Sequence, residues 1–274
     1  AYNLIHRAKS GFTKGEYYIV YNFFRGLRPI VEKFSPDKIY FVLEGYPKHR
    51  GAIHTEYKGN RPSQSDSFKR QKSTVINIIK NNFPIECVFH PDFECDDVIA
   101  TLTYYHAQKG DECTVVSTDT DMIQIHNICK FTLYNPVKKK NIPSPGYDYV
   151  TWKALTGDKS DNIPGIPGIG NKRAQNLVNN KPLLLEFLNN EENRQTFEKN
   201  VNLIRLVDLR DSLSEFIRYP ESRSWEDVRS AFEEMHFKKM IEDKAWNKYV
   251  TTFSTVKFWG TYEKKYGYKR YKDS

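Results

Sequence analysis

Three groups of acidic residues, far apart along the chain, carry side chains that could hold divalent metal ions. The first group opens an expected helix, the second follows an expected buried strand, and the third lies at an expected helix start or turn. In chain order they are Glu94, Asp96 and Asp97, then Asp119 and Asp121, then Asp158 and Asp161. Carboxylate oxygens are the ligands that Mg²⁺ prefers, and this ion takes the rest of its shell from water and substrate phosphate.

Together, such groups could carry out phosphodiester hydrolysis. Two divalent ions about 4 Å apart can activate a water molecule and stabilise the leaving oxygen of an in-line displacement. Each group alone would equally suit a helix N-cap or a solvated loop. All of them together indicate a metal site, because repulsion among clustered carboxylates is tolerable only when cations are present. We therefore expect two Mg²⁺ ions, for which Mn²⁺ can substitute.

Strands that alternate with helices would bring these acids to one edge of a sheet. Short apolar runs predict strands, and apolar residues at helical spacing predict the helices between them. The expected strands are Asp37–Leu43, Glu86–Phe89, Glu112–Ser117 and Phe131–Tyr134, and the expected helices are Gly15–Lys33, Ser73–Asn82, Cys95–Gln108 and Asp121–His126. This order is typical of an α/β fold with a mostly parallel central sheet, where ligands bind beyond the carboxyl ends of the strands. Glu44, at the end of the first strand, is therefore an expected metal ligand too.

The pattern changes near residue 150, where helices alone are expected. They cover residues 151–155, 172–179, 182–188, 191–206 and 225–234. We expect an α/β metal-binding core over residues 1–150 and a helical DNA-binding region over residues 151–274. Between the first two strands, the polar and basic stretch 45–72 predicts a loop or mobile arch. With the helix that follows it, the arch region covers about residues 45–82.

The charge of the chain favours a polyanionic partner. The 274 residues carry a formal net charge of +8, and the pI is about 9.1. Basic residues crowd 48–72, 138–140, 172–173 and the C-terminal tail, whereas the acids of interest form a few clusters. This separation suggests metal ions that are held against phosphates.

Membrane-spanning and exported proteins are disfavoured by the sequence. It has no run of about 18 apolar residues and no charged-then-apolar leader. Its four cysteines show no CxxC spacing, which favours free thiols over a disulfide framework or a zinc site. We expect a monomer that acts in the cytoplasm without contact to membranes.

Two basic segments have residue types that suit a nucleic-acid backbone. In 162–174, aliphatic residues alternate with glycine and proline before a basic helix start, so that the backbone could approach a phosphate. The expected DNA contacts there are Gly168, Gly170, Lys172 and Arg173. Within the arch, Tyr57, Lys58 and Arg61 lie at the base, and Lys69, Arg70 and Lys72 would line the path of a single strand. An ordinary Gly/Pro loop and a solvated basic face are the respective alternatives.

These segments together carry a family resemblance. The stretches Glu94-Cys-Asp-Asp97, Ser117-Thr-Asp-Thr-Asp121 and Gly157-Asp-Lys-Ser-Asp-Asn-Ile-Pro-Gly-Ile-Pro-Gly-Ile-Gly170 resemble the signature of the 5′ nuclease (flap endonuclease) family. Glu56-Tyr-Lys-Gly-Asn-Arg61 and Asn202-Leu-Ile-Arg-Leu-Val-Asp208 are similar to further family motifs. The family includes small bacteriophage 5′ nucleases and the N-terminal domain of bacterial DNA polymerase I. The short arch and the lack of a polymerase part most resemble the stand-alone bacteriophage 5′-3′ exonucleases.

The resemblance implies a PIN-like fold with a helical arch and a helix–three-turn–helix at about 151–180 that grips duplex DNA. It implies cleavage of DNA with 5′ single-strand flaps or ends, RNA/DNA primers included, in phage DNA replication or repair within the host cell. Tyr57, Lys58 and Arg61 would act in catalysis, since Lys and Arg can neutralise the scissile phosphate and Tyr can stack on an unpaired base. A potassium ion would be bound by backbone carbonyls, which by position are those of Leu155, Thr156, Pro164, Ile166 and Ile169.

Two departures from the family pattern affect the metal site. The family has Asp at the end of its second strand, whereas this chain has Glu44, whose longer side chain could still reach a metal. The family's first strand and its metal-ligating Asp are expected before residue 1, because Ala1-Tyr-Asn-Leu4 resembles the family residues that come directly after that Asp. The alternative function is therefore a catalytically weakened DNA junction-binding protein. A third interpretation, a PIN-type ribonuclease, would leave the Ile-Pro-Gly repeats unexplained.

Overall fold

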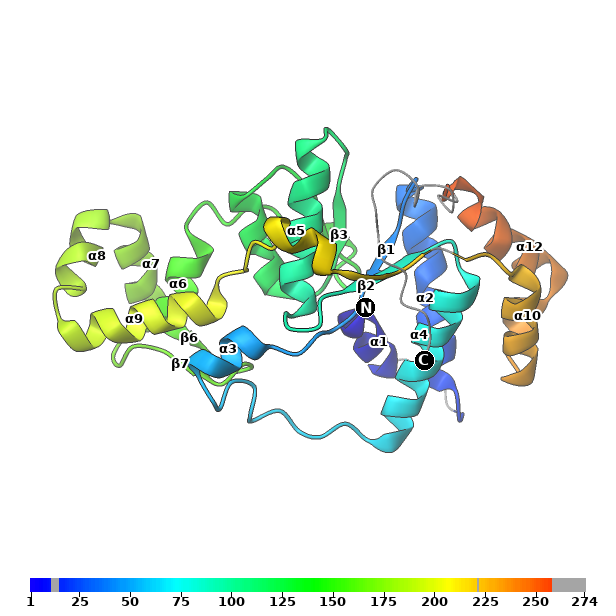
Figure 1. The fold of residues 1–274 in the computed structure, drawn as a ribbon, viewed down its shortest axis with the longest axis horizontal. Helices are drawn as coiled ribbons and strands as arrows, with labels where there is room; N and C mark the ends of the chain where they lie inside the picture. The colour runs from blue at the N-terminus through cyan, green and yellow to red at the C-terminus, as the bar shows by residue number, and fades with distance from the viewer. Residues whose placement is uncertain (11–14, 221, 258–274) are drawn as a thin grey trace. The chain divides into compact units, whose positions relative to one another are not determined.

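The computed structural model describes residues 1–10, 15–220 and 222–257. The chain forms two compact units, each built from segments that are separated in the sequence (Figure 1). The first unit comprises residues 1–44, 64–91 and the chain from 214 onward, and the second comprises 45–63 and 92–213. The segment 45–63 therefore begins and ends at residues of the first unit although it packs within the second.

The first unit contains a small mixed sheet and most of the longer helices. Its elements are α1 (Tyr2–Arg7), η1 (Ala8–Ser10), α2 (Tyr18–Phe34), β1 (Tyr40–Val42), α4 (Asp66–Asn82), β2 (Glu86–Phe89), β8 (Ile217–Tyr219), α10 (Trp225–Glu234), α11 (Lys238–Ile241), α12 (Asp243–Thr252) and η4 (Phe253–Thr255). β1 and β2 are parallel, and β8 lies antiparallel on the other side of β2. The C-terminal strand thus completes a sheet that the N-terminal part of the chain begins.

Aromatic rings form the centre of the first unit's core. The ring of Phe24, on α2, lies 5.3 Å from that of Phe83 and 5.2 Å from that of Phe232 on α10. Phe83 also contacts Phe253, at 5.2 Å between ring centroids. All four side chains are fully buried. Because one cluster joins α2, α10 and the C-terminal helices, the end of the described chain belongs to the same core as its beginning.

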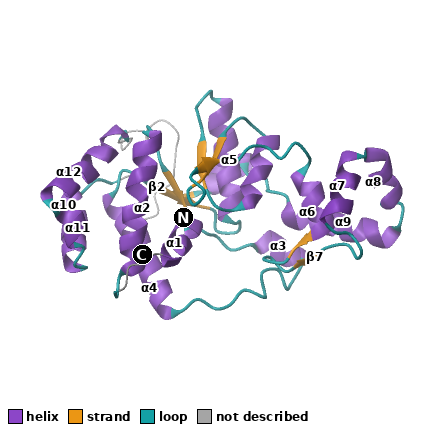
Figure 2. Cartoon of the chain, turned by 180° about the vertical axis from the view of Figure 1, so that it is seen from behind, coloured by secondary structure: helices purple, strands orange, loops and turns teal. Residues whose placement is uncertain are grey.

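The second unit combines another small sheet with a bundle of helices. Its elements are α3 (Lys48–Ile53), α5 (Cys95–Gln108), β3 (Thr114–Val116), η2 (Thr120–Asn127), β4 (Thr132–Asn135), β5 (Lys140–Asn141), α6 (Tyr149–Thr156), β6 (Gly157–Asp158), β7 (Ile163–Pro164), α7 (Asn171–Asn179), α8 (Lys181–Phe187) and α9 (Glu191–Ile204), with η3 (Arg210–Glu215) at its end. β3 and β4 are parallel, β5 is antiparallel to β4, and β6 forms a short hairpin with β7. Helices greatly exceed strands in extent (Figure 2).

The expected α/β class, with partly parallel sheets, is confirmed. β2, α5 and α10 have the predicted bounds. The other predicted strands and helices are present with ends shifted by at most three residues, apart from α4, whose start differs more. The strands divide between two three-stranded sheets, order β1-β2-β8 and β3-β4-β5, and the two-stranded sheet β6-β7, where one central sheet was expected. The antiparallel strands β5 to β8 and the helices α11 and α12 were not predicted.

The loop predicted over residues 45–72 is wrong in two places. It contains α3, and it contains the first turns of α4, which begins at Asp66 and was expected only from residue 73. Ser65 caps α4, because its side chain accepts a hydrogen bond from the Phe68 N–H. Phe68 is buried and continues the apolar stripe of the helix toward its N-terminus. Because basic and polar residues surround Phe68, the sequence did not reveal that the apolar stripe of α4 extends this far.

No helix within the described ranges is both long and apolar enough to cross a membrane. The four cysteines, Cys87, Cys95, Cys113 and Cys129, are free thiols. Burial raises the pKa of Cys87 to about 12 and that of Cys113 to about 11. These thiols are therefore weak nucleophiles at neutral pH.

Candidate metal centre

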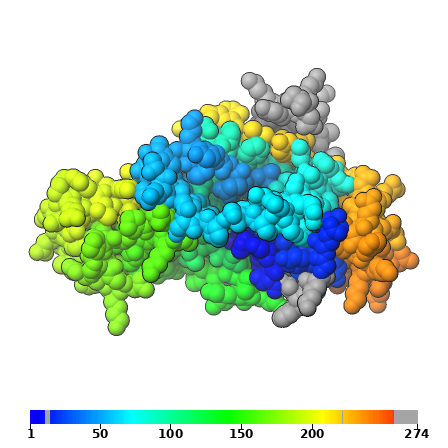
Figure 3. Space-filling view, turned by 90° about the horizontal axis from the view of Figure 1, so that it is seen from below, coloured from blue at the N-terminus to red at the C-terminus, as the bar shows by residue number. Residues whose placement is uncertain are grey.

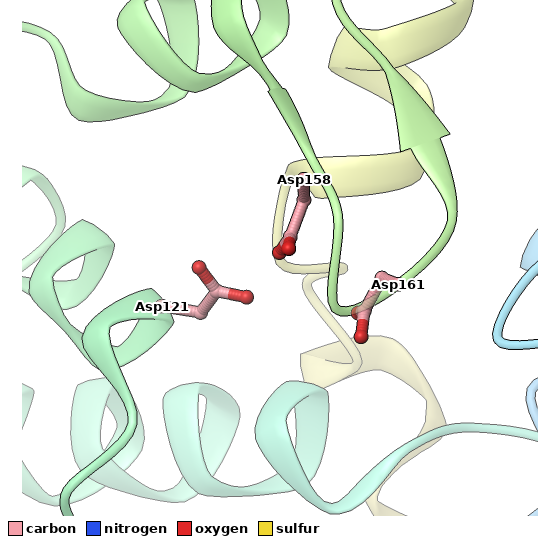
Figure 4. Close-up of side chains that lie close together, drawn as sticks. All are labelled: Asp121, Asp158 and Asp161. Carbon is pink, nitrogen blue, oxygen red and sulfur yellow. The ribbon is translucent and has the colours of Figure 1, made fainter. Parts of the chain in front are cut away.

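Three aspartates of the second unit bring their carboxylates together (Figure 4). One oxygen from each of Asp121, Asp158 and Asp161 lies within 4.8 Å of the others. Asp121 comes from η2, Asp158 ends β6, and Asp161 lies in the turn between β6 and β7. Oxygen donors at this spacing fit the shell of a hard divalent cation, so the donor set agrees with the predicted metal.

The β6–β7 hairpin fixes the positions of two of these acids. Gly157 has φ +77°, and a Cβ there would lie 2.6 Å from the Ile163 carbonyl oxygen, so only glycine fits. The Asp158 carboxylate accepts hydrogen bonds from the backbone N–H (2.8 Å) and the hydroxyl (2.7 Å) of Ser160. This short turn brings Asp161 back to the same side as Asp158.

A buried lysine lies between two of the acids. Lys153, on α6, forms an ion pair with Asp121 and another, at 2.6 Å, with Asp158. Burial raises the pKa of Asp121 to about 6, although Lys153 acts in the opposite direction. Burial also raises the pKa of Asp158, but hydrogen bonds from Lys153 and Ser160 outweigh it, and the pKa is lowered. Burial lowers the pKa of Lys153, but Asp121, Tyr149 and Asp158 together outweigh burial, and the pKa is raised.

The three residues predicted to act in catalysis lie beside Glu94 and Asp161. Glu94 is 3% exposed and pairs with the Lys58 ammonium. The Tyr57 hydroxyl lies 3.0 Å from Glu94 and 3.1 Å from Asp161. Arg61 pairs with Asp161 at 2.5 Å. The structure thus brings the three predicted catalytic side chains to two of the predicted metal ligands.

The Tyr57 side chain is fixed by packing and by hydrogen bonds, and its ring is partly buried. Its side chain packs against a cluster that includes Val150 and Ile163. Burial, and then the charge of Glu94, raise the pKa of its hydroxyl far above the usual range. The hydroxyl therefore stays protonated and is available as a hydrogen-bond donor to the two carboxylates.

Asp97 has a different environment from the other acids. It is fully buried, and its two oxygens accept hydrogen bonds from both terminal nitrogens of Arg50, at 2.6 and 2.8 Å. The backbone N–H of Val207 donates to it as well, at 2.8 Å. The Arg50 Nε donates to the carbonyl of Leu203 near the end of α9. This geometry favours a structural role for Asp97 over the predicted metal ligation.

Backbone and side-chain hydrogen bonds join the segment 45–63 to the β6–β7 turn. The Lys58 N–H donates to the Asp161 carbonyl at 3.0 Å, and the Asn60 amide donates to the Lys159 carbonyl at 2.8 Å. In return, the Asn162 side chain donates to the Glu56 carbonyl at 2.9 Å. In the space-filling view, the light-blue atoms of this segment lie against the green part of the chain (Figure 3). The predicted base of the arch is therefore bound to the loop that carries the acids.

The remaining acids of the second unit lie nearby with other contacts. Asp119 caps η2 by accepting a hydrogen bond from the Asp121 N–H at 3.0 Å. Asp96 accepts a long contact, 3.4 Å, from the thiol of Cys95. A narrow pocket is lined by Glu94, Asp96, Asp121, Asp158 and Asp161. Asp119 is not among its lining residues.

The predicted DNA-binding segment forms the loop before α7 and the start of that helix. Gly170 is the N-cap of α7, and Gly168 has φ +74°. Lys172 and Arg173 are exposed in the first turn, and the Arg173 guanidinium lies 5.6 Å from the ring of Phe187 on α8. Since α7 has no acidic residue in its first turn, its N-terminus presents backbone N–H groups and positive charge together.

The carbonyls predicted to bind potassium surround the β6–β7 hairpin. Those of Leu155 and Ile166 accept backbone hydrogen bonds from Ile166 and Ile169, and that of Pro164 accepts from the Asn200 amide. A carbonyl oxygen has two lone pairs, so one hydrogen bond leaves room for an ion. Thr156 and Ile169 complete the predicted set, which stays a prediction.

Four of the predicted site residues belong to the first unit. Glu44 and Lys72 line a cavity of about 360 Å³. Lys69, Arg70 and Lys72 lie on α4, where Lys69 pairs with Asp66 and Arg70 with Glu16. These three residues are helical, whereas the sequence placed them in a loop.

Sequence reasoning missed Arg50 and Lys153, although each contacts two carboxylates of the site. Arg50 is one of many basic residues in 48–72, and no spacing distinguishes it. Lys153 had a usable signal, because it lies one helical turn after Tyr149 and five residues before Asp158. A lysine on the apolar face of a helix, close to predicted ligands, needs an acidic partner to be buried.

Comparison with known proteins gives two family matches. Residues 1–150 match the 5′-3′ exonuclease N-terminal resolvase-like domain, and residues 145–215 match the 5′-3′ exonuclease C-terminal SAM fold. A 5′-3′ exonuclease of Aquifex aeolicus is 29% identical over 82% of this chain and 84% of its own length. A 5′-3′ exonuclease of Buchnera aphidicola is 30% identical, over 65% of both chains. A DNA polymerase I of Streptococcus pneumoniae is 28% identical over 68% of this chain, which spans 22% of that protein.

Two solved structures share the fold. The T5 D15 protein co-crystallized with metal ions has a TM-score of 0.60 and 20% identity, over 78% of this chain and 89% of that one. A complex of the bacteriophage T5 D15 flap endonuclease with DNA and metal ions has a TM-score of 0.61 and 19% identity, over 78% and 88%.

Proposed function

Because this chain belongs to the 5′-3′ exonuclease family, we propose that it is a structure-selective 5′ nuclease that hydrolyses DNA phosphodiesters near junctions of single and double strands. The observation that carries the proposal is the meeting of Asp121, Asp158 and Asp161 in one pocket, with Lys58 and Arg61 beside it. Acids that hold cations and cations that hold phosphate are the two requirements of metal-assisted phosphodiester hydrolysis.

We assign two Mg²⁺ ions, which Mn²⁺ can replace, to the acids of this pocket. The proposed ligands are the pocket acids Glu94, Asp96, Asp121, Asp158 and Asp161, together with Asp119, which accepts a hydrogen bond from the Asp121 N–H. Glu44 belongs to the first unit, and metal ligation by it stays a separate prediction. When bound, such ions activate a water molecule and stabilise the leaving 3′ oxygen. Asp97 is assigned instead to holding Arg50, since both of its oxygens are already bonded to that guanidinium.

The basic residues of segment 45–63 are proposed to bind the scissile phosphate. Lys58 and Arg61 neutralise Glu94 and Asp161 in the structure, and their side chains end beside the pocket. A phosphate placed there would offer Lys58 and Arg61 another negatively charged partner in place of the carboxylates. Tyr57 is proposed as a positioning residue, because its hydroxyl lies within hydrogen-bond distance of both carboxylates.

Duplex DNA is proposed to bind at the N-terminus of α7. Gly168 and Gly170 allow close approach, and Lys172 and Arg173 add charge at the helix end. The carbonyls of Leu155, Thr156, Pro164, Ile166 and Ile169 would hold a potassium ion, whose positive charge would favour phosphate binding. Lys69, Arg70 and Lys72 on α4 are proposed contacts for the single strand.

The biological setting is inferred from the relatives. Matches to 5′-3′ exonucleases and to a DNA polymerase I support a role in replication or repair, with flaps and RNA/DNA primers as substrates. We further propose that the chain is a phage enzyme that acts as a monomer in the host cytoplasm; its fold is shared with the bacteriophage T5 flap endonuclease.

A flap-cleavage assay tests this proposal. A 5′-flap substrate should be cut in Mg²⁺ and left intact in excess EDTA. Asp158→Asn should lower the single-turnover rate by at least about 100-fold and retain DNA binding. Asp211→Asn, the same charge change at an exposed residue of η3, should behave as wild type.

Two results would contradict the proposal. Turnover by the wild-type protein in excess EDTA would exclude a metal-dependent mechanism. Tight binding of the flap substrate with no cleavage in Mg²⁺ or Mn²⁺ would favour the junction-binding alternative.

A further inference from the structure

Lys153 occupies the space between two acids to which metal binding is assigned. Its ammonium pairs with Asp121 and with Asp158, and the residue is only 7% exposed. The ring of Tyr149, one turn earlier on α6, lies 5.8 Å from the Lys153 Nζ. A lysine this buried is stabilised by its partners, and here both partners are predicted metal ligands.

The ammonium and a divalent ion would be drawn to the same oxygens. An ion bound between Asp121 and Asp158 would lie within a few ångströms of the Lys153 Nζ, where like charges repel strongly in a buried site. Without any cation, the two carboxylates would repel each other instead. Lys153 therefore stabilises the pair and at the same time opposes a metal ion that binds to it.

We propose that Lys153 is an internal counterion, which holds Asp121 and Asp158 together until a divalent ion binds and which lowers the affinity for that ion. This inference rests on the metal binding proposed above. Binding of the ion releases the ammonium from at least one carboxylate, and the Tyr149 ring offers it another favourable contact. The Tyr149 hydroxyl, 3.4 Å from the Asp121 carboxylate, remains beside the acid.

The other cations of the site are placed differently. Arg50 donates to both oxygens of Asp97 and to the carbonyls of Leu203 and Arg205, and it also pairs with Glu94 at 2.8 Å. Its contacts with Asp97 and the two backbone carbonyls hold the guanidinium in place whether or not Glu94 binds a metal ion. Lys58 lies on segment 45–63, pairs closely with Glu94 and lies 3.8 Å from Asp161. Lys153 comes from a helix and pairs closely with two of the three clustered aspartates, Asp121 and Asp158. It is therefore the cation whose removal should most directly change metal binding.

Calorimetric titration of the whole chain with MnCl₂, in the absence of DNA, tests the proposal. Lys153→Met removes the charge and keeps most of the side-chain length. This variant should bind Mn²⁺ about tenfold more tightly than wild type, the lower end of the effect of a neighbouring charge on a carboxylate. Its Tm in EDTA should be below that of wild type, and Mn²⁺ should raise its Tm by a larger amount.

Lys159→Met is the matched control. Lys159 is exposed on the same β6–β7 turn, so its loss changes the net charge equally without touching either carboxylate. Its Mn²⁺ affinity and its Tm should be those of wild type. An equal gain of affinity in both variants would show that net charge, and not the position of Lys153, sets the affinity, and would overturn the proposal.

The other outcomes also decide the question. A folded Lys153→Met protein that binds Mn²⁺ no more tightly than wild type contradicts the proposal. Should this variant be unfolded in EDTA, refolding on addition of Mn²⁺ supports it, and a chain that stays unfolded in Mn²⁺ contradicts it. Wild-type protein that binds no Mn²⁺ overturns both this proposal and the metal centre. Tighter Mn²⁺ binding by the variant, together with wild-type protein that binds Mn²⁺ and cleaves no flap, would leave the counterion role standing and contradict the nuclease assignment.

Discussion

The carboxylates of the candidate centre differ in what stabilises their charge. Asp97 has Arg50 on both oxygens, and Asp158 has Lys153 together with two hydrogen bonds from Ser160. Asp121 is half-buried and shares a single lysine with Asp158. Desolvation penalises the charged form of an acid, and it raises the pKa of Asp121.

The first prediction concerns the pH dependence that arises from Asp121. Its pKa is raised to about 6, so between about pH 4 and pH 6 the folded chain binds a proton that the unfolded chain has released. Stability in EDTA should therefore fall as pH rises through this window. Asp121→Asn removes this contribution, so its free energy of unfolding relative to wild type should increase by about 1 kcal/mol between pH 5 and pH 7. Urea unfolding of both proteins at pH 5 and pH 7 measures this difference in the free energy of unfolding. A difference that is the same at the two pH values would contradict the prediction.

The second prediction separates chemistry from binding. Lys58→Met should lower the single-turnover rate of flap cleavage by about 100-fold or more, because a cation beside the pocket is lost. Methionine has a Cβ as lysine does, so it adds no new strain at the positive φ of this residue, 57°. Lys172→Met should leave the rate at saturating enzyme unchanged. It should weaken DNA binding and reduce the slope of log affinity against log salt by about 1.

Single-turnover kinetics measures the cleavage rate, and fluorescence anisotropy at several salt concentrations measures the DNA affinity and its salt dependence. Equal losses of affinity in the two variants, with no change in rate, would show that Lys58 acts only as a binding residue.

The sequence identified the acids of the site and two of the cations that pair with them, Lys58 and Arg61, but not Arg50 and Lys153. Asp119 and Asp121 were found because they follow an apolar strand, and Asp158 and Asp161 because of their spacing before the Ile-Pro-Gly repeats. Lys153 lies on a predicted helix close to the predicted ligand Asp158, but its pairing with Asp121 depends on the spatial meeting of α6 with η2. A contact of this kind depends on tertiary structure and leaves no periodic signal of its own.

At the scale of elements, the β6–β7 hairpin positions two of the three clustered aspartates. Gly157→Ala should destabilise it, because a Cβ would lie 2.6 Å from the Ile163 carbonyl oxygen in a backbone conformation with φ +77°. We expect a cost of about 2–3 kcal/mol and weaker Mn²⁺ binding. Gly110→Ala is the control, since Gly110 has φ +85° with nothing within 4 Å. Gly110→Ala introduces the same strain of a positive φ but no steric clash. It should therefore lower the free energy of unfolding by less than Gly157→Ala does and leave the Mn²⁺ affinity unchanged.

Thermal unfolding and calorimetry of these two variants measure the effects. Equal Mn²⁺ affinities for Gly157→Ala and wild type would show that the hairpin does not position the acids.

The elements that the sequence predicted well are those with a strong apolar pattern and a clear stop. α5 follows a capping position at Glu94 and ends near Gly110, and β2 lies between Pro84 and Pro91. The start of α4 was missed because the buried Phe68 is surrounded by basic and polar residues. β8 is three residues long and half-buried, and it is recognisable only from its pairing with β2.

At the scale of the whole molecule, the chain alternates between two units whose segments are far apart in the sequence. The predicted boundary near residue 150 rested on a change from strands to helices, and it stays a prediction. Packing divides the chain differently, because residues 214–257 complete the sheet and the aromatic core begun by residues 1–44. The segment 45–63, which carries Tyr57, Lys58 and Arg61, is attached at both ends to this first unit.

This connection predicts that the activity depends on the stability of the first unit. Phe232 is fully buried, and its ring lies 5.2 Å from that of Phe24. Phe232→Ala should cost about 3–5 kcal/mol, and hydrogen exchange should show the loss of protection mainly in α2, α4 and α10. Because opening of this unit releases both ends of segment 45–63, thermal inactivation of flap cleavage should shift to lower temperature together with it. Leu185 on α8 is 57% exposed, so Leu185→Ala should change neither the hydrogen-exchange protection of the first unit nor the inactivation temperature. A Phe232→Ala protein that loses protection in the first unit but keeps the wild-type inactivation temperature would show that segment 45–63 is held by its contacts with the β6–β7 turn alone.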